Sequence, residues 1–192
     1  AILRALPQVT VFTPGDPAEV EAVVPIMVKT PGTCYLRLGR GGEPTLHTQP
    51  ITDYKLGQGL TLRHGTDIAL LSAGGILTQT VSAAEKLAER GVSAEVVSFP
   101  TLKPIDRELI LSLTKRFRHL ITVEEHTIIG GLGSAVCEVV AEEGAPCRVH
   151  RMGMQDTYSC IVGNQQYLRQ RYGMDDEAIA AKAEALVKEV RA

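Results

Sequence analysis

From about residue 61 onward, short apolar segments alternate with amphipathic helical segments, and this alternation constrains the fold more than any other feature. Residues 67–73 are almost continuously apolar, as expected for a strand covered on both faces. Further strands are predicted at 94–99, 119–123 and 148–152, and helices begin near residues 77, 106, 130 and 175. Strands alternating with helices predict a three-layer α/β/α domain with a mostly parallel sheet.

The first 39 residues read as a single β-α-β unit. Residues 9–14 and 34–39 have the β-branched and apolar character of strands. Between them, Asp16 is a good N-cap, Pro17 suits the first helical position and Glu19 follows three residues after the cap. One such unit cannot bury enough apolar surface to stand alone. It should therefore either pack onto the following domain or be the end of a domain that begins upstream, and we favour the second. Glycines and prolines in 41–60 indicate a linker or a long surface loop.

Bulk composition excludes several classes of partner. The chain has 20 basic and 22 acidic residues and a net charge of −2, which gives no electrostatic reason to expect nucleic acid or an anionic membrane surface. No apolar run approaches the ~20 residues needed to span a bilayer. The four cysteines form no Cys-x-x-Cys pair and show no zinc-site spacing. We expect reduced thiols of a cytoplasmic protein, and no metal site.

Two groups of polar residues follow predicted strands, where ligands of open parallel sheets bind. Arg37 lies at the end of the second strand and Arg40 follows among glycines, where backbone can approach an anion closely. Ordinary salt bridges are the alternative for both arginines. Glu124, Glu125 and His126 follow another strand and could perform acid-base chemistry. Their alternative role is a hydrogen-bonded anchor or an interface contact, because no nucleophile or metal partner is visible nearby.

A third candidate is the glycine-rich segment 130–134, which opens a helix. Glycines at this position can cradle a phosphate group. The dinucleotide-binding pattern requires glycine at a third position, which Val136 fills here, and the segment does not follow its strand directly. Close helix packing and a tight turn therefore explain these glycines better than a nucleotide site.

Five segments, in the same order, resemble motifs of the thiamine-diphosphate-dependent transketolase family, most of all its short two-subunit type. The most specific is 121–136, with its Glu-Glu-His and Gly-Gly-Leu-Gly-Ser runs. The others are 6–16, 35–40, 65–71 and 100–106. The resemblance implies that residues 1–42 end a pyrimidine-binding domain, 43–61 form a linker and 62–192 form the C-terminal domain.

The resemblance also implies how chemistry is divided along the complete enzyme. In the family, the activating glutamate, the stacking aromatic residue and the metal-binding aspartate lie upstream, so this chain should contain no catalytic residue and bind neither thiamine diphosphate nor Mg²⁺ alone. Arg40 matches an arginine that helps to hold the sugar-phosphate substrate. The C-terminal domain of the family mainly builds a homodimer, which favours structural roles for Glu124, Glu125 and His126.

These resemblances predict the C-terminal part of an enzyme that moves two-carbon ketol units between sugar phosphates, with a separate N-terminal transketolase subunit as a candidate partner. The alternatives are part of a deoxyxylulose-phosphate synthase, part of a 2-oxo-acid dehydrogenase beta subunit, or a free-standing dimerisation or binding module. The chain departs from the subfamily at one place: after residue 156 the family commonly has an aromatic residue and a Gly/Ser-rich stretch, whereas residues 157–164 read Thr-Tyr-Ser-Cys-Ile-Val-Gly-Asn here.

Overall fold

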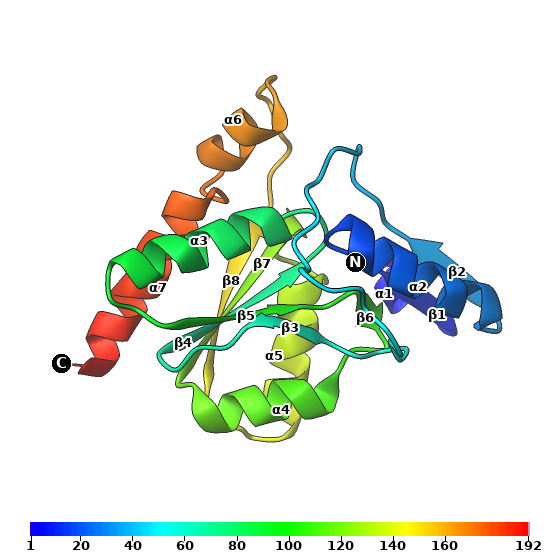
Figure 1. Ribbon diagram of the computed structural model, residues 1–192, viewed down its shortest axis with the longest axis horizontal. Coiled ribbons are helices and arrows are strands. Elements are labelled where there is room, and N and C mark those ends of the chain that lie inside the picture. Colours follow the sequence, from blue (N-terminus) through cyan, green and yellow to red (C-terminus); the bar gives the residue numbers. More distant parts are fainter. Residues whose placement is uncertain (192) are drawn as a thin grey trace.

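A computed structural model describes residues 1–191, except the side chain of Arg191, and its strands form two sheets (Figure 1). The larger sheet has five strands in the order β3-β5-β4-β7-β8. These strands are β3 (Leu60–Arg63), β4 (Ile68–Ala73), β5 (Ala94–Ser98), β7 (His119–Thr127) and β8 (Arg148–Met154). All neighbours pair in parallel except β3 and β5. The prediction of a mostly parallel sheet is therefore confirmed.

Helices cover both faces of this sheet, which confirms the predicted three layers (Figure 1). One face carries α3 (Leu77–Glu89) and α7 (Asp176–Arg191), and the other carries α4 (Arg107–Arg116) and α5 (Leu132–Glu142). Successive side chains of β4 point to opposite faces, so Ile68 and Leu70 join the first core and Leu71 joins the second. Burial on both faces explains why this strand is apolar throughout.

The smaller sheet has the order β2-β1-β6. It contains β1 (Val9–Phe12), β2 (Thr33–Leu36) and β6 (Thr101–Lys103), preceded by the short helix α1 (Ile2–Ala5). Strands β1 and β2 pair in parallel around α2 (Pro17–Lys29), as the β-α-β unit predicts. Strand β6 follows β5 of the larger sheet in the sequence, but it pairs antiparallel with β1. The β-α-β unit is thus completed by a strand that the sequence analysis did not predict.

Thr13 joins the two sheets where their strands end. Its backbone amide donates to the carbonyl of Pro100 at 2.7 Å, and its hydroxyl donates to the carbonyl of Phe99 at 3.0 Å. Its own carbonyl accepts from the amide of Gly74, also at 3.0 Å. Because Gly74 follows β4 and Phe99 follows β5, the carboxyl ends of β1, β4 and β5 meet at this residue.

Several predicted boundaries are wrong. Strand β7 runs to Thr127 rather than 123, because its last residues still pair with β8 past a register shift. Glu124, Glu125 and His126 therefore lie within the strand and not after it. Strand β2 ends at Leu36, so Arg37 lies just beyond it. The helix α6 (Gln165–Arg171) was not predicted, because it is short and lacks an apolar stripe.

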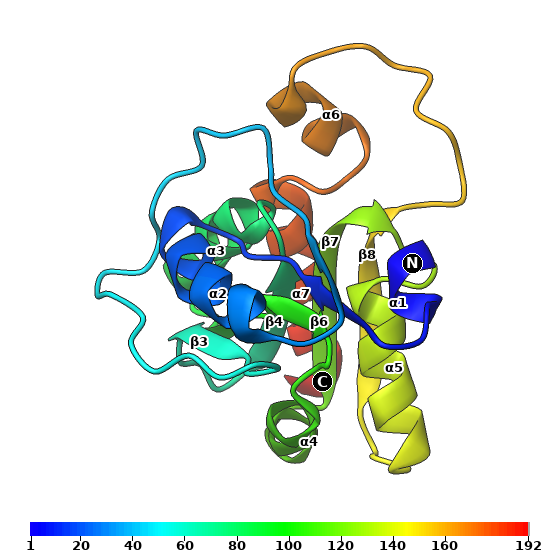
Figure 2. The same cartoon turned by 90° about the vertical axis from the view of Figure 1, so that its right-hand side faces the viewer.

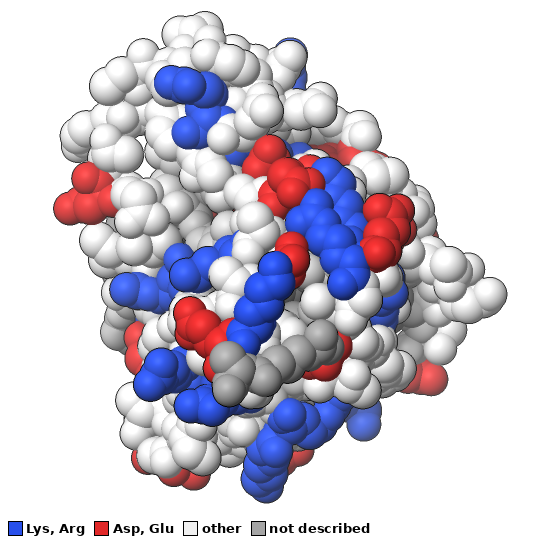
Figure 3. Space-filling model, turned by 90° about the vertical axis from the view of Figure 1, so that its left-hand side faces the viewer, with Lys and Arg blue, Asp and Glu red and all other residues white. Residues whose placement is uncertain are grey.

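The face around α3 and α7 carries interspersed acidic and basic side chains (Figure 3). Lys86 of α3 and Arg90, which follows this helix, form ion pairs with Asp176, Glu177 and Glu184 of α7. All of these groups are partly or well exposed to solvent, so each pair stabilises the fold only weakly. No helix within residues 1–191 has the length and apolar character needed to cross a membrane.

His119 and His150 lie side by side at the start of β7 and β8. Nδ1 of His119 is 3.0 Å from Nε2 of His150. Burial lowers the pKa of both imidazoles, and the charge of Arg118 also lowers that of His119. The short contact fits one shared proton between neutral rings, because two imidazolium ions at this distance would repel each other.

We expect this histidine pair to make folding less stable in acid. The folded-state pKa of each ring lies below the unfolded value near 6.5, so the stabilisation is present above that pH and is lost as the pH falls below it. Urea unfolding at pH 7.5 and 5.0 measures how much the free energy of unfolding falls between these pH values. We expect this fall to be about 1 kcal/mol smaller for His150→Gln than for the wild type. Equal losses in both proteins would contradict this account.

Candidate functional site

The carboxyl ends of both sheets border a cavity of about 730 Å³. Its lining includes Tyr35 near the end of β2 and Arg37 just after it. Gly74 and Gly75 after β4 and the last residues of β7 also line it. Residues of α1 close one side of the cavity, where Arg4 forms an ion pair with Glu138 of α5. Figure 2 shows α1 beside α5. This is the crevice that the open-sheet rule predicts, and it brings Arg37 together with Glu124, Glu125 and His126.

The side chain of Glu124 binds the first turn of α5. Its carboxylate is buried and accepts hydrogen bonds from the amides of Leu132 at 2.8 Å and Gly133 at 2.9 Å. Burial raises the pKa of Glu124, although these two hydrogen bonds oppose the increase. A Cβ atom at Gly131 would lie 1.8 Å from the carboxylate. The glycines of segment 130–134 therefore allow close packing, as inferred from the sequence.

Glu125 and Arg37 connect neighbouring segments. The Glu125 carboxylate accepts from Nε of Arg169 at 2.5 Å, and a second nitrogen of Arg169 donates to the carbonyl of Gly75 at 3.2 Å. These contacts attach α6 to β7 and to the loop after β4. Arg37 donates to the backbone carbonyl of Glu125 at 3.2 Å. The arrangement supports the interpretation of Glu125 as an anchor.

His126 is oriented by a neighbouring backbone group. Its Nδ1 donates to the carbonyl of Thr127 at 2.7 Å, and its Nε2 lies 3.2 Å from the amino group of Ala1. Glu124 points into the start of α5 and Glu125 toward α6, so these side chains do not converge with His126 on one reacting atom. The geometry offers no acid-base pair of the kind that the sequence pattern suggested.

Arg40 lies at a second cavity, of about 390 Å³. This cavity adjoins the first through Leu38, Gly39 and Gly75, and its lining also includes Asp16 at the start of α2. Arg40 is exposed, and its guanidinium has no side-chain partner among residues 1–191. It is therefore free to bind an anionic ligand, whereas Arg37 is directed toward β7.

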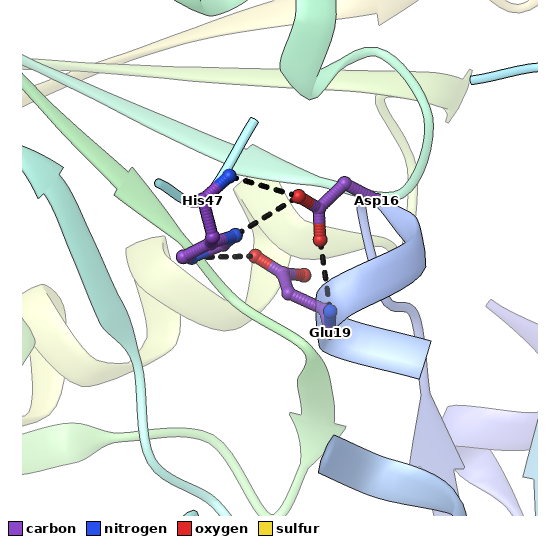
Figure 4. Close-up of side chains that lie close together, drawn as sticks. All are labelled: Asp16, Glu19 and His47. Carbon is purple, nitrogen blue, oxygen red and sulfur yellow. Dashed lines mark hydrogen bonds and ion pairs between the residues drawn. The ribbon is translucent and has the colours of Figure 1, made fainter. Parts of the chain in front are cut away.

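His47 belongs to a buried polar cluster that sequence reasoning missed (Figure 4). Nδ1 of His47 donates to Asp16 at 3.0 Å, and its Nε2 faces the carboxylate of Glu19 at 3.7 Å. Both carboxylates are almost fully buried. His47 lies in a glycine- and proline-rich loop, 31 residues from Asp16, so no spacing rule connects them.

The cluster is the one group of three acidic, His or Cys residues in the described chain that could share a metal ion. Asp16, however, already accepts hydrogen bonds from the ring of His47 and from the amides of Glu19, Leu46 and His47. Within this cluster, the buried atoms that have no hydrogen-bond partner among residues 1–191 are Oε1 of Glu19 and Nε2 of His47. Two such atoms are fewer than the three or four protein ligands of zinc sites.

Removal of the Glu124 carboxylate should destabilise the fold. Glu124→Ala leaves the buried amides of Leu132 and Gly133 without acceptors, which we expect to cost about 2–3 kcal/mol in the free energy of unfolding. Glu124→Gln keeps one acceptor and should cost less. Urea denaturation measures both losses. Glu142→Ala, at the exposed end of α5, is the control and should change stability by less than about 0.5 kcal/mol. A Glu124→Ala variant as stable as this control would contradict the assigned role.

The order of the strands, the crevice at their carboxyl ends and the sequence all lead to one family. The family model described as "Transketolase, C-terminal domain" matches residues 57–179. The chain belongs to this family and is a C-terminal transketolase-like portion.

Individual relatives agree with this assignment. The chain is 35% identical over 187 residues to one subunit of the apulose-4-phosphate transketolase of Actinobacillus succinogenes, covering 96% of this chain and 59% of that protein. It is also 35% identical over 183 residues to a putative transketolase C-terminal section of Methanocaldococcus jannaschii, covering 95% and 57% of the two chains. Against 1-deoxy-D-xylulose-5-phosphate synthase 1 of Geobacter metallireducens the identity is 38% over 190 residues, covering 98% and 30%.

Solved structures show the same fold. A split-gene transketolase, described as an inactive beta4 tetramer, superimposes with a TM-score of 0.90 at 35% identity and covers 97% of this chain and 60% of that one. A transketolase of Pichia stipitis in complex with sedoheptulose-7-phosphate superimposes with a TM-score of 0.76 at 22% identity, covering 98% and 26% of the two chains. The present chain thus spans less than two thirds of the length of these relatives.

Proposed function

We propose that this chain supplies the C-terminal part of a thiamine-diphosphate-dependent transketolase that moves two-carbon ketol units between sugar phosphates. The names of the relatives support a transketolase activity for the complete enzyme. The alternative, a deoxyxylulose-phosphate synthase, draws support from the relative at 38% identity. Both assignments give Arg40 the same task, because the family motif at 35–40 is associated with binding of the substrate phosphate in each.

The observation that carries the proposal is the guanidinium of Arg40, which has no partner within residues 1–191 and lies beside a cavity next to the crevice. Such a group binds a phosphate by charge-assisted hydrogen bonds. The start of α2 adds little attraction, because the carboxylates of Asp16 and Glu19 already accept its amides. Glu43 lines the same cavity and would repel an anion. Recognition of the phosphate therefore depends mainly on Arg40.

The cofactor is proposed to bind to residues outside this chain. Thiamine diphosphate requires a divalent ion with oxygen ligands, and the Asp16 cluster has only one carboxylate oxygen without a partner within the described residues. When bound in the complete enzyme, the cofactor would supply the carbanion chemistry. The contribution of this chain is to hold the substrate phosphate and to build the crevice.

We further propose that the complete enzyme is an assembly. One relative is named as a single subunit of its transketolase, and another is described as a beta4 tetramer. These descriptions support association with an N-terminal transketolase subunit and with a second copy through the C-terminal domain. The four cysteines are unpaired, which fits a cytoplasmic location.

Arg40→Ala should weaken the use of phosphorylated sugars selectively. In the complete enzyme we expect KM for a phosphorylated acceptor to rise about 10–100-fold, because a charge-assisted hydrogen bond is lost, while KM for an unphosphorylated acceptor changes little. Steady-state kinetics with both acceptors measures the ratio. Arg118→Ala removes an exposed arginine that precedes β7 and is the matched control. Equal effects of Arg40→Ala on both acceptors would remove Arg40 from the phosphate site.

Residues 1–192 alone should not bind the cofactor. Titration of the chain with thiamine diphosphate and magnesium in a calorimeter should give no heat of binding, because the residues proposed to hold the cofactor lie elsewhere in the complete enzyme. Binding with a micromolar dissociation constant would contradict the proposed division of roles.

A further inference from the structure

Asp16 attaches the loop that contains Arg40 to the start of α2. One oxygen of its carboxylate accepts hydrogen bonds from the amide of Leu46 at 2.7 Å, the amide of His47 at 3.1 Å and the ring of His47 at 3.0 Å. The other oxygen accepts from the amide of Glu19 and caps the helix. A single buried carboxylate thus fixes both the helix and the far end of the loop that begins after β2.

The side chains of Glu19 and His47 face each other at a distance too long for a hydrogen bond. Oε2 of Glu19 accepts from the amide of Gly15 at 2.7 Å, but Oε1 is fully buried and has no hydrogen-bond partner in the described part of the chain. Nε2 of His47 is likewise buried and has no hydrogen-bond partner among the described residues, and the two atoms are 3.7 Å apart. If neither group held a proton, two electron-pair acceptors would face each other in a site that already contains the charge of Asp16.

The cluster and Arg40 share one small region. Asp16 and Arg40 both line the smaller cavity, together with Glu43 of the intervening loop. A proton on the Glu19–His47 pair reduces the negative charge beside this cavity and keeps His47 attached to its neighbours. Both effects favour an anion at Arg40, the first through the local potential and the second through the position of the loop.

We propose that a proton shared by Glu19 and His47 holds the Arg40 loop in place and makes binding of a phosphate or similar dianion at Arg40 dependent on pH. His47 and Glu19 are positioning residues in this account, since neither contacts the anion. The inference rests on the proposed function, because it assumes that Arg40 binds the substrate phosphate.

The ionisation of the cluster agrees with this geometry. Burial raises the pKa of Glu19 to about 7, although the hydrogen bond from Gly15 opposes the shift. Burial works against the charged form of His47, but its hydrogen bond to Asp16 and the charges of Glu19 and Asp16 outweigh it and raise its pKa. Both folded-state values exceed the unfolded ones, so the pair keeps a proton below neutral pH and loses it as the pH rises through about 7.

The other groups around the pair do not titrate in this range. Burial would raise the pKa of Asp16, but hydrogen bonds from His47 and three backbone amides hold it well below the usual value, so Asp16 stays ionised. Burial raises the pKa of Tyr54 to about 12, so its phenol stays neutral. From β5, the uncharged hydroxyl of Ser98 lies beside Glu19. The change in charge between pH 6.5 and 8.5 therefore belongs to Glu19 and His47.

The test uses inorganic sulfate, whose charge is constant in this range, as a competitor of the phosphorylated substrate in the complete enzyme. For the wild type we expect the inhibition constant of sulfate to rise about fivefold between pH 6.5 and 8.5. Glu19→Gln imitates the protonated carboxyl and should keep the low-pH value at both pH values. His47→Ala should bind sulfate weakly at both, and His47→Asn, which can still donate to Asp16, should restore binding without the pH dependence.

Glu85→Gln, an exposed carboxyl on α3, is the matched control and should keep the wild-type profile. Arg40→Ala separates the two proposals. If Arg40→Ala weakens sulfate binding while Glu19→Gln retains the wild-type pH dependence, the role of the proton is wrong and the phosphate site stands. If Arg40→Ala leaves sulfate binding unchanged, the phosphate site itself is wrong, and the pH mechanism fails with it.

Discussion

The contact between β1 and the segment that follows β5 determines how the two sheets are arranged. Thr13 is bonded to the carbonyls of Phe99 and Pro100 and to the amide of Gly74, and β6 then pairs with β1. Parallel strands end at the same edge of a sheet, so this junction brings the carboxyl ends of two sheets together. The crevice exists because these edges meet, and neither sheet could form it alone.

Charged residues at this edge divide into two kinds. The carboxylate of Glu124 binds amides at the start of α5, and that of Glu125 binds Arg169 of α6, so both hold the walls of the crevice together. Arg40 has no such partner within residues 1–191 and lies on a glycine-rich loop. A carboxylate that is already paired cannot easily serve a substrate, whereas a free guanidinium can bind an anion without breaking an existing contact.

Local patterns predicted the parts of the fold that local forces determine. The continuous apolar run of β4 and the caps Asp16 and Asp106 signal their elements directly, and the structure contains them. Strand β6 was missed because three residues carry no readable period, and its partner β1 lies far away in the sequence. Helix α6 was missed because contacts of Arg169, and not an apolar stripe, hold it in place. Among the candidate site residues, the sequence placed Arg37 and residues 124–126 at one edge, but it could not show that the side chains of residues 124–126 point in different directions.

His47 illustrates the limit of spacing arguments most clearly. Nothing about one histidine in a loop indicates that Asp16 and Glu19 will lie against both of its ring nitrogens. Once the loop folds over α2, however, burial leaves few ways to satisfy two carboxylates and an imidazole: four hydrogen bonds satisfy Asp16, and a proton can satisfy the remaining pair. The same capping residues that begin α2 therefore also determine how the loop is held. Helix formation and the position of Arg40 are coupled through a single carboxylate, so a change at Asp16 would alter both together.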